Sequence, residues 1–346
     1  MVGLYSKYPL LEAVIRRSPV SRSWTIVVFI GVLLLLLVLM ASLDGELASL
    51  LEWSEAGFFV FLILFIIYFL VVYPFMLRAR EQAVLAFKPL LSLDADAFNK
   101  VAENISKPSR RWEWTAIFLG ISVFMAINIQ PWNMDGTSDF SWLIVYFAIT
   151  LAIVYGLMGW LIYDTLVGIV RISRLSRQDL KLDILDTEMI APVASWSLGI
   201  SLVFVGAILL SIIGNVSQSA KVLLDAKTIV GYVLMICITL LIFFLSMWSA
   251  HRALSEAKKS KLTLARKHLA GISLELEDRV AKGQRRGMME LSSTITALAT
   301  YKREVQEAPT WPFNAGIVRR LLLSILTPGL VYSIKILSQV GIRFGN

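Results

Sequence analysis

The residue of this chain whose type and position most suggest chemistry is Asp164, which lies inside an apolar stretch. It falls in the hydrophobic segment Trp142–Val170, seven residues before Arg171. Burying a carboxylate among apolar residues is costly, so such a group is a candidate for moving ions or protons. The alternative is structural, because Asp164 lies 22 residues after Trp142, about 33 Å along a helix. It would then lie at the inner boundary of the segment and pair with Arg171 or Arg174.

Two amides, Asn128 and Gln130, flank the end of the apolar segment Trp114–Ile129. Amide groups at such a place could line a pore mouth or bind an ion. The alternative is that they cap a helix end or hydrogen-bond a neighbouring helix. Together with Asp164, they form a candidate polar path for conduction or gating.

The sequence offers no set of residues suited to a metal, a cofactor or catalysis. His251 and His268 are 17 residues apart with no cysteine near them, whereas a metal site needs clustered ligands. The single cysteine, Cys237, excludes an intrachain disulfide. No nucleotide-binding loop, zinc-protease helix or hydrolase serine motif occurs. We therefore predict a non-enzymatic protein without a cofactor, and keep a membrane-embedded enzyme as a third class.

The elements that must position these groups are apolar segments of membrane-spanning length. The chain is 57% apolar and 17% charged, against about 45–50% and 25% in soluble domains. A helix needs about 20 apolar residues to cross a bilayer. We interpret six segments as spans: Trp24–Leu43, Gly57–Leu77, Trp114–Ile129, Trp142–Val170, Pro192–Ile213 and Thr228–Ser249. The first is too long for a signal peptide, so we expect it to be retained.

The basic residues predict which way these spans are oriented. Of 33 Lys and Arg, only Lys221 and Lys227 fall in segments assigned to the outside. Cytoplasmic loops carry the Lys/Arg excess, so residues 1–23, 78–112 and 171–191 and both termini are expected in the cytoplasm. The protein would be a multi-pass protein of the cell membrane, or inner membrane. The net charge of +8 does not indicate nucleic acid, because anionic lipid headgroups beside the spans account for it.

Residues 250–307 predict a cytoplasmic arm that follows the sixth span. Apolar residues recur at spacings of three and four, typical of a coiled-coil seam, and residues 282–287 with two glycines interrupt the pattern. We expect an antiparallel helical hairpin. Its apolar stripes pack on each other or form a partner surface for another subunit: Leu262, Leu269, Ile272, Leu276, Leu291, Ile295 and Leu298.

The C-terminal segment 308–346 is bounded by prolines and ends in a hydrophobic stretch. Its apolar core Leu321–Ile334 has 14 residues and contains Pro328. This is shorter than a span, so a re-entrant or interfacial helix is predicted. A seventh span is the alternative, and it would place the C-terminus outside.

Several short elements of the second half resemble a family of uncharacterised prokaryotic polytopic membrane proteins. The elements are Trp311-Pro312-Phe313, Arg319-Arg320 with Pro328, Asp183 and Asp186 with Pro192, and His251-Arg252. The resemblance covers about the last half of the chain. It implies a membrane architecture and a prokaryotic origin, and no activity.

Two function classes therefore compete. The favoured hypothesis is an integral membrane scaffold or sensor that forms homo-oligomers and engages a cytoplasmic protein through its arm. The polar residues are concentrated in that arm, while the spans contain almost no charge. The alternative is an ion channel or transporter that uses Asp164, Asn128 and Gln130. Under either hypothesis the expected partners are the bilayer and anionic headgroups, and nucleic acid is not expected.

Overall fold

The structure of this protein is a computed structural model, and the residues it describes are helical almost throughout. The described residues are 9–48, 53–91, 94, 96–98, 109–128, 141–176, 191–214, 226–283, 288–311 and 315–344. Their helices are α1 (Leu10–Arg17), α2 (Arg22–Leu43), α3 (Trp53–Ala86), α5 (Arg110–Asn128), α6 (Trp142–Leu175), α7 (Ala191–Gly214), α9 (Ala226–Ala281), α10 (Met288–Glu307) and α11 (Ala315–Phe344). The all-α prediction is confirmed for this part of the chain.

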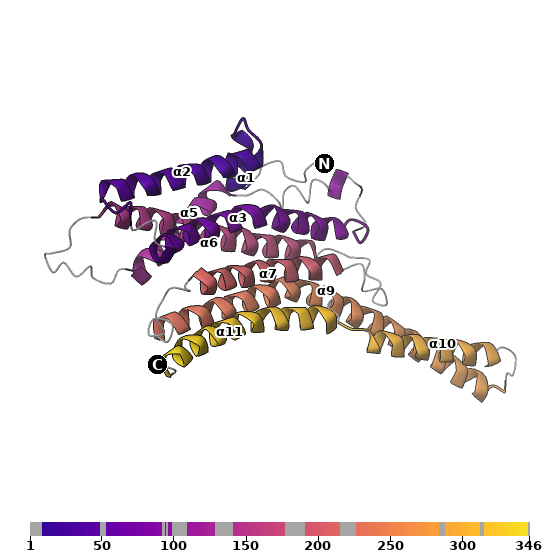
Figure 1. Cartoon of the computed structure of the whole chain (residues 1–346). Coiled ribbons are helices and arrows are strands. Elements are labelled where there is room, and N and C mark those ends of the chain that lie inside the picture. The colour runs from indigo at the N-terminus through magenta and orange to yellow at the C-terminus, as the bar shows by residue number, and fades with distance from the viewer. Residues whose placement is uncertain are drawn as a thin grey trace.

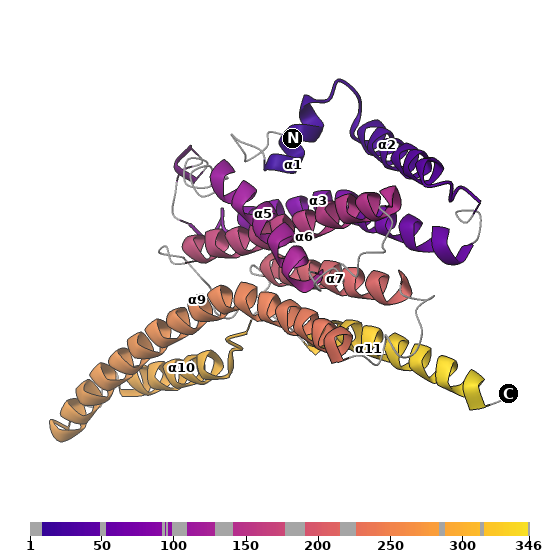
Figure 2. The same ribbon diagram turned by 90° about the vertical axis from the view of Figure 1, so that its left-hand side faces the viewer.

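Most of these helices pack into a single bundle, from which one arm projects (Figures 1 and 2). The bundle contains α2, α3, α5, α6, α7, the first half of α9 and α11. The second half of α9 leaves the bundle, and α10 runs back along it. We call residues 250–307 the arm, the end of the bundle from which it projects the arm end, and the opposite end the far end.

Six described helices are long and apolar enough to cross a membrane. They are Arg22–Leu43, Phe59–Ala86, Trp142–Leu175, Ala191–Gly214, Thr228–Ala281 and Gly316–Ser338. Five of these contain or overlap expected spans. The sixth belongs to α11, whereas α5, the third expected span, is not among them because it begins with Arg110, Arg111 and Glu113. These helices are consistent with a multi-pass membrane protein.

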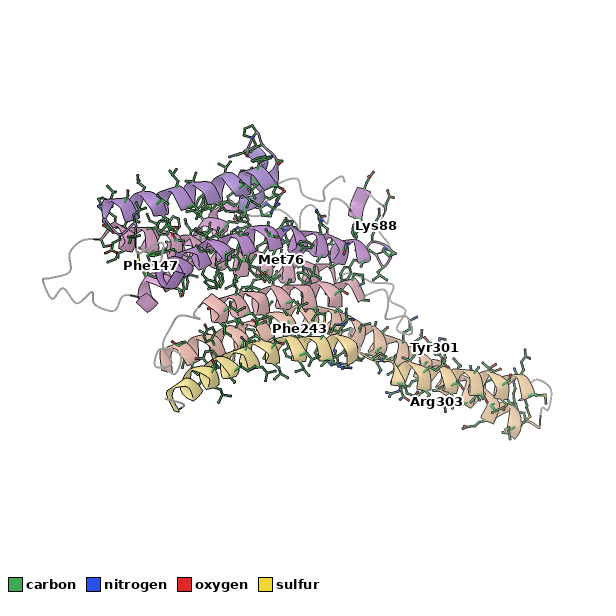
Figure 3. All side chains as sticks on the ribbon, in the orientation of Figure 1. Met76, Lys88, Phe147, Phe243, Tyr301 and Arg303 are labelled. Atoms are coloured by element: carbon green, nitrogen blue, oxygen red, sulfur yellow. The ribbon has the colours of Figure 1, made fainter. Side chains whose placement is uncertain are left out.

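The outer surface of the bundle is apolar, as a lipid environment requires. Leu35, Phe118, Val230 and Leu330 are each more than 60% exposed. Soluble proteins rarely expose apolar patches of large area. The interior is filled by large side chains that include Ile66, Tyr73, Trp196 and Phe243. Figure 3 shows Met76 and Phe243 among the packed helices.

Glycines allow α5 and α6 to pack with their backbones in close approach. A Cβ atom on Gly159 would lie 2.6 Å from the carbonyl oxygen of Ala116 and 3.0 Å from the Cα of Gly120. A Cβ on Gly156 would lie 3.2 Å from the side chain of Ile117. Small residues serve this purpose in membrane bundles, where van der Waals contact drives helix association. Gly156 and Gly159 therefore lie where α6 meets α5 most closely.

The C-terminal helix is longer than the 14-residue apolar core on which the sequence prediction rests. The structure contains one continuous helix of 30 residues that passes through Pro328 and packs against α7. Hydroxyl groups in the preceding turn bond backbone carbonyls, from Ser324 Oγ to Leu321 O and from Thr327 Oγ1 to Leu323 O. The helix therefore runs to the far end of the bundle (Figure 1).

The arm consists of the second half of α9 and of α10, packed side by side as a helical hairpin. α9 continues without a break for 56 residues, about 84 Å, and the chain turns after Gly283, whose φ of +65° favours glycine. The seven predicted seam residues are all half-buried, while most residues between them are exposed. Ala265 and Val305 are fully buried in the same seam. The two stripes therefore pack on each other, and this seam is not a free surface for another subunit.

Candidate functional site

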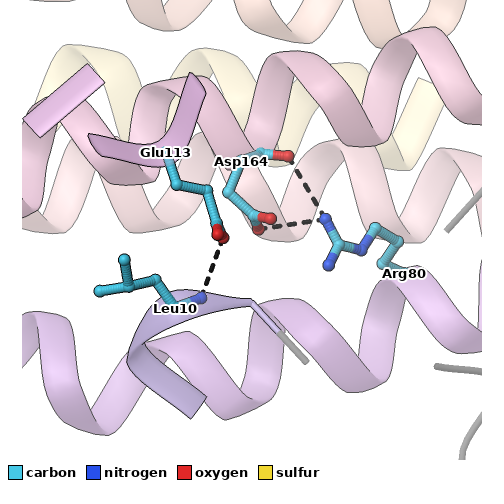
Figure 4. A network of polar contacts seen from close by, with 4 residues as sticks. All are labelled: Leu10, Arg80, Glu113 and Asp164. Atoms are coloured by element: carbon cyan, nitrogen blue, oxygen red, sulfur yellow. Dashed lines mark hydrogen bonds and ion pairs between the residues drawn. The ribbon is translucent and has the colours of Figure 1, made fainter. Parts of the chain in front are cut away.

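A buried ion pair between α3 and α6 lies near the arm end of the bundle. The guanidinium nitrogen Nη1 of Arg80 is 3.0 Å from Oδ2 of Asp164 and donates at 3.3 Å to the carbonyl oxygen of the same residue. The exposed fractions of the two side chains are 5% and 9%. Asp164 is therefore a paired group within the helix packing (Figure 4).

The local sequence of α6 makes room for this pair. Gly168 lies one turn after Asp164, and a Cβ there would be 3.1 Å from Cδ of Arg80 and 3.3 Å from the ring of Trp196. The arginine side chain thus lies across the glycine to reach the carboxylate. The partners predicted for Asp164, Arg171 and Arg174, lie on the same helix, whereas the observed partner, Arg80, lies on α3 and was not predicted.

A second polar contact beside this pair holds the N-terminal helix. The carboxylate of Glu113, at the start of α5, accepts a hydrogen bond of 2.9 Å from the backbone N–H of Leu10. The Glu113 side chain is 1% exposed. Figure 4 shows Glu113 next to Asp164, with Leu10 on its other side. Arg22 adds a contact of 2.7 Å to Glu12, so α1 is held by charged groups from α5 and α2.

The geometry of this cluster suits holding helices together. Arg80 and Asp164 neutralise each other in an apolar surrounding, and removing one partner of such a buried pair is destabilising. The rings of Tyr73 and Trp160 pack beside the pair with centroids 4.6 Å apart. The pair therefore joins α3 to α6 at fixed positions.

The structure does not bring the candidate polar path together. Asn128 is the last residue of α5 and Glu113 is in its first turn, so about 22 Å of helix separates Asn128 from the Asp164 cluster. Gln130 lies outside the described residues. A continuous path among these residues is therefore not part of the described structure.

A different carboxylate, Asp44, joins two helices at the far end. It follows α2 and accepts hydrogen bonds from the backbone N–H groups of Trp142 and Leu143 and from the Ser141 hydroxyl, at 2.8–2.9 Å. The backbone N–H groups in the first turn of a helix have no partner within the helix itself. Desolvation raises the pKa of Asp44, but the three hydrogen bonds outweigh it and hold the pKa below its usual value. Asp44 thus caps a helix that begins almost 100 positions later.

The base of the arm is fixed to the bundle by a ring stack and a lysine. His251 and Trp311 stack with centroids 4.0 Å apart and an interplanar angle of 13°, and Nδ1 of His251 is 3.0 Å from Thr310 O. Nζ of Lys258 donates to the carbonyls of Gln306 and Ala308, both at 2.7 Å. These contacts place the end of α10 beside α9 where the arm begins.

Inside the bundle, α9 is attached to α7 through buried hydroxyls. Ser197 Oγ contacts Ser246 Oγ and donates to the carbonyl of Phe243 at 3.2 Å. Ser197 and Ser246 are at most 1% exposed. Interhelical hydroxyl bonds of this kind fix helix pairs in an apolar environment. The arm therefore continues a helix whose inner half is held firmly.

No protein-family model, no curated protein and no solved structure matches the chain, so comparison with known proteins assigns neither a family nor an activity to it. The two elements of the proposed resemblance that are adjacent in the structure are His251 and Trp311. Their contact could not be derived from the sequence, in which they are 60 positions apart.

Proposed function

We propose that this chain is a multi-pass protein of the cell membrane that acts as an oligomeric scaffold or sensor through its cytoplasmic arm, without catalysis of its own. The observation that carries the proposal is α9, a single helix from the far end of the bundle to the tip of the arm. It is held by α7 inside the bundle and by α10 outside it. Displacement of the arm would therefore be transmitted to the bundle.

The exposed charges support a cytoplasmic position for the arm end. Exposed bases of the bundle and of α1 that lie toward this end are Arg17, Arg78, Lys88, Arg110, Arg111, Arg174, Arg319 and Arg320. Basic flanks mark the cytoplasmic side of membrane spans. Exposed Trp112, Trp114 and Trp248 lie near the same end, as expected of aromatic anchors in the headgroup region.

The continuity of α11 favours seven crossings over six. With α5 and α11 both crossing, the end of α11 would lie outside and the arm would remain in the cytoplasm. Lys335 and Arg343, in the second half of α11, would then join Lys221 and Lys227 toward the outside. The bases would still be strongly biased to the arm side, with four of 33 outside.

Any partner of the arm would meet its outer surface, because the seam is occupied by the hairpin itself. Leu274 and Met289 are exposed near the tip, at 66% and 88%. They stand among charged side chains, so the outer surface is mainly polar. A homo-oligomer or a cytoplasmic protein would therefore bind through mixed charged and apolar contacts.

Excision of the arm tests the proposal. Because Lys258 contacts Gln306 and Ala308, residues 261–303 can be replaced by a short Gly-Ser linker that spans neighbouring positions. We expect a folded bundle of unchanged thermal stability, with a smaller oligomer by mass measurement in nanodiscs. A matched variant, Ser260→Ala in the full-length chain, should keep the oligomer. An unchanged oligomer mass after the excision would refute a role of the arm in assembly.

A further inference from the structure

Charge is distributed unevenly along the arm. The half near the bundle, residues 250–268 and 300–307, contains eight bases and three acids. The half near the tip, residues 269–299, contains four bases and four acids. The arm is therefore positive at its base and carries no net charge toward its tip.

The two halves also differ in how their charges are paired. Near the tip, Arg279 contacts Glu275 and Lys282 contacts Asp278, both at 2.6 Å. Near the base, the ion pair formed among described residues is Arg252 with Glu256. The other bases on the α9 side are exposed or half-exposed: Lys258, Lys259, Lys261, Arg266 and Lys267. Positive charge at the base is thus largely open to other molecules.

The basic half lies where lipid headgroups would be if the apolar bundle is in a bilayer. Ser249 ends the apolar part of α9. Lys258 and Lys261 follow it by about 14 and 18 Å along the helix. The headgroup region adds roughly 6 Å to each side of the hydrocarbon, and an anionic surface acts over a further Debye length of about 8–10 Å. Lys88 and Arg303 also lie toward this end in Figure 3.

We propose that the base of the arm binds anionic phospholipid headgroups, and that the tip, which carries no net charge, stands away from the same surface. Each Lys or Arg near an anionic leaflet gains about 1 kcal/mol, and the balanced charge of the tip gives it no net attraction to the leaflet. Asp278 is about 44 Å along α9 from Ser249, beyond the reach of the surface potential. Anionic lipid therefore orients the arm, and this holds whether or not the arm assembles oligomers.

Headgroup contact can be measured by fluorescence quenching in the full-length chain. In a Cys237→Ser background, a fluorophore is attached at Leu264→Cys or at Met289→Cys, both exposed positions. Nanodiscs contain a nitroxide-headgroup lipid in phosphatidylcholine, with or without phosphatidylglycerol. We expect phosphatidylglycerol to increase quenching at position 264 roughly twofold, and about 1 M salt to abolish the increase. The label at position 289 should remain unquenched in both lipids.

Neutralisation distinguishes lipid binding from a general effect of the nanodisc. Lys259, Lys261, Arg266 and Lys267 changed together to Gln should remove the phosphatidylglycerol response. The matched control, Arg279→Gln with Lys282→Gln at the tip, should retain it. An unchanged melting temperature verifies that both variants fold. Equal quenching at position 264 in the two lipids, or a full response in the fourfold variant, would overturn the proposal, and quenching at position 289 equal to that at 264 would overturn the orientation.

Discussion

The bundle and the arm are both made of helices, but their ion pairs differ in burial and in whether they join two helices. In the apolar interior of the bundle, charges are few and buried, as with Arg80 and Asp164, which are nearly inaccessible and join two helices. In the arm, charges are many and exposed, and their pairs lie within single helices, as with Arg279 and Glu275. Buried pairs between helices specify which elements meet, whereas exposed pairs within a helix contribute little stability.

The comparison teaches where each region is vulnerable. The bundle depends on a small number of contacts between distant parts of the sequence: the buried ion pair, the α5–α6 glycines and the Asp44 cap. The arm depends on an apolar seam spread over many residues, with Ala265 and Val305 at its most buried points. Single substitutions should therefore affect the bundle strongly and the arm mainly at its seam.

The largest effect is expected from breaking the buried ion pair on one side only. Asp164→Ala removes one partner of a buried ion pair, a change that destabilises proteins by about 3–5 kcal/mol. Thermal or denaturant unfolding in detergent measures the loss. The double variant Arg80→Met with Asp164→Leu removes both charges and should recover most of it. If Asp164→Ala unfolds like the wild type, the pair does not hold α3 to α6.

The next largest effect is expected where α5 and α6 approach most closely. Gly159→Leu would place side-chain atoms into the backbone of Ala116 and Gly120 and should cost about 1–3 kcal/mol through overpacking. Gly199→Ala is the matched control, because nothing lies within 4 Å of a Cβ at that position. Equal unfolding midpoints for the two variants would show that the close approach of these helices is not required.

Local patterns in the sequence predicted much of the fold because helix and span length depend on neighbouring residues. The apolar runs coincide with five of the six described helices that are long and apolar enough to cross a membrane, and Leu262, Leu269 and Ile272, at three- and four-residue spacing, are half-buried in the arm. The continuous helix through Pro328, which packs against α7, was not evident from the local sequence.

The contacts of the candidate site could not be predicted in the same way. Arg80 and Asp164 are 84 positions apart, and either residue alone fits several partners. The spacing of Asp164 and Gly168 on one helical face is the single local signal, since a small residue one turn from an acid leaves space for a long side chain. Only the packing of α3 on α6 selects Arg80.

A smaller effect, confined to the arm, is expected from a charge in its seam. Ala265→Asp places a carboxylate at a position that is 3% exposed, and an unpartnered buried polar group costs about 1–3 kcal/mol. The hairpin should open, which faster trypsin cleavage at the arm lysines would report, while unfolding of the bundle stays unchanged. Leu264→Asp, at an exposed neighbouring position, is the control. If Ala265→Asp also lowers the unfolding midpoint of the bundle, the stability of the bundle depends on the folded arm.

The smallest effect is expected at the far end, where Asp44→Ala removes hydrogen bonds from the exposed N-terminus of α6. The pKa of Asp44 is lowered in the folded protein from its ordinary value of 3.8, so folding favours the ionised carboxylate. The stabilisation is therefore present above pH 3.8 and is lost as the pH falls below that value through the folded pKa. Unfolding midpoints of the wild type and Asp44→Ala should differ at neutral pH and converge under acid conditions. A difference in unfolding midpoint that persists or grows in acid would show that the Asp44 cap does not act through its charge.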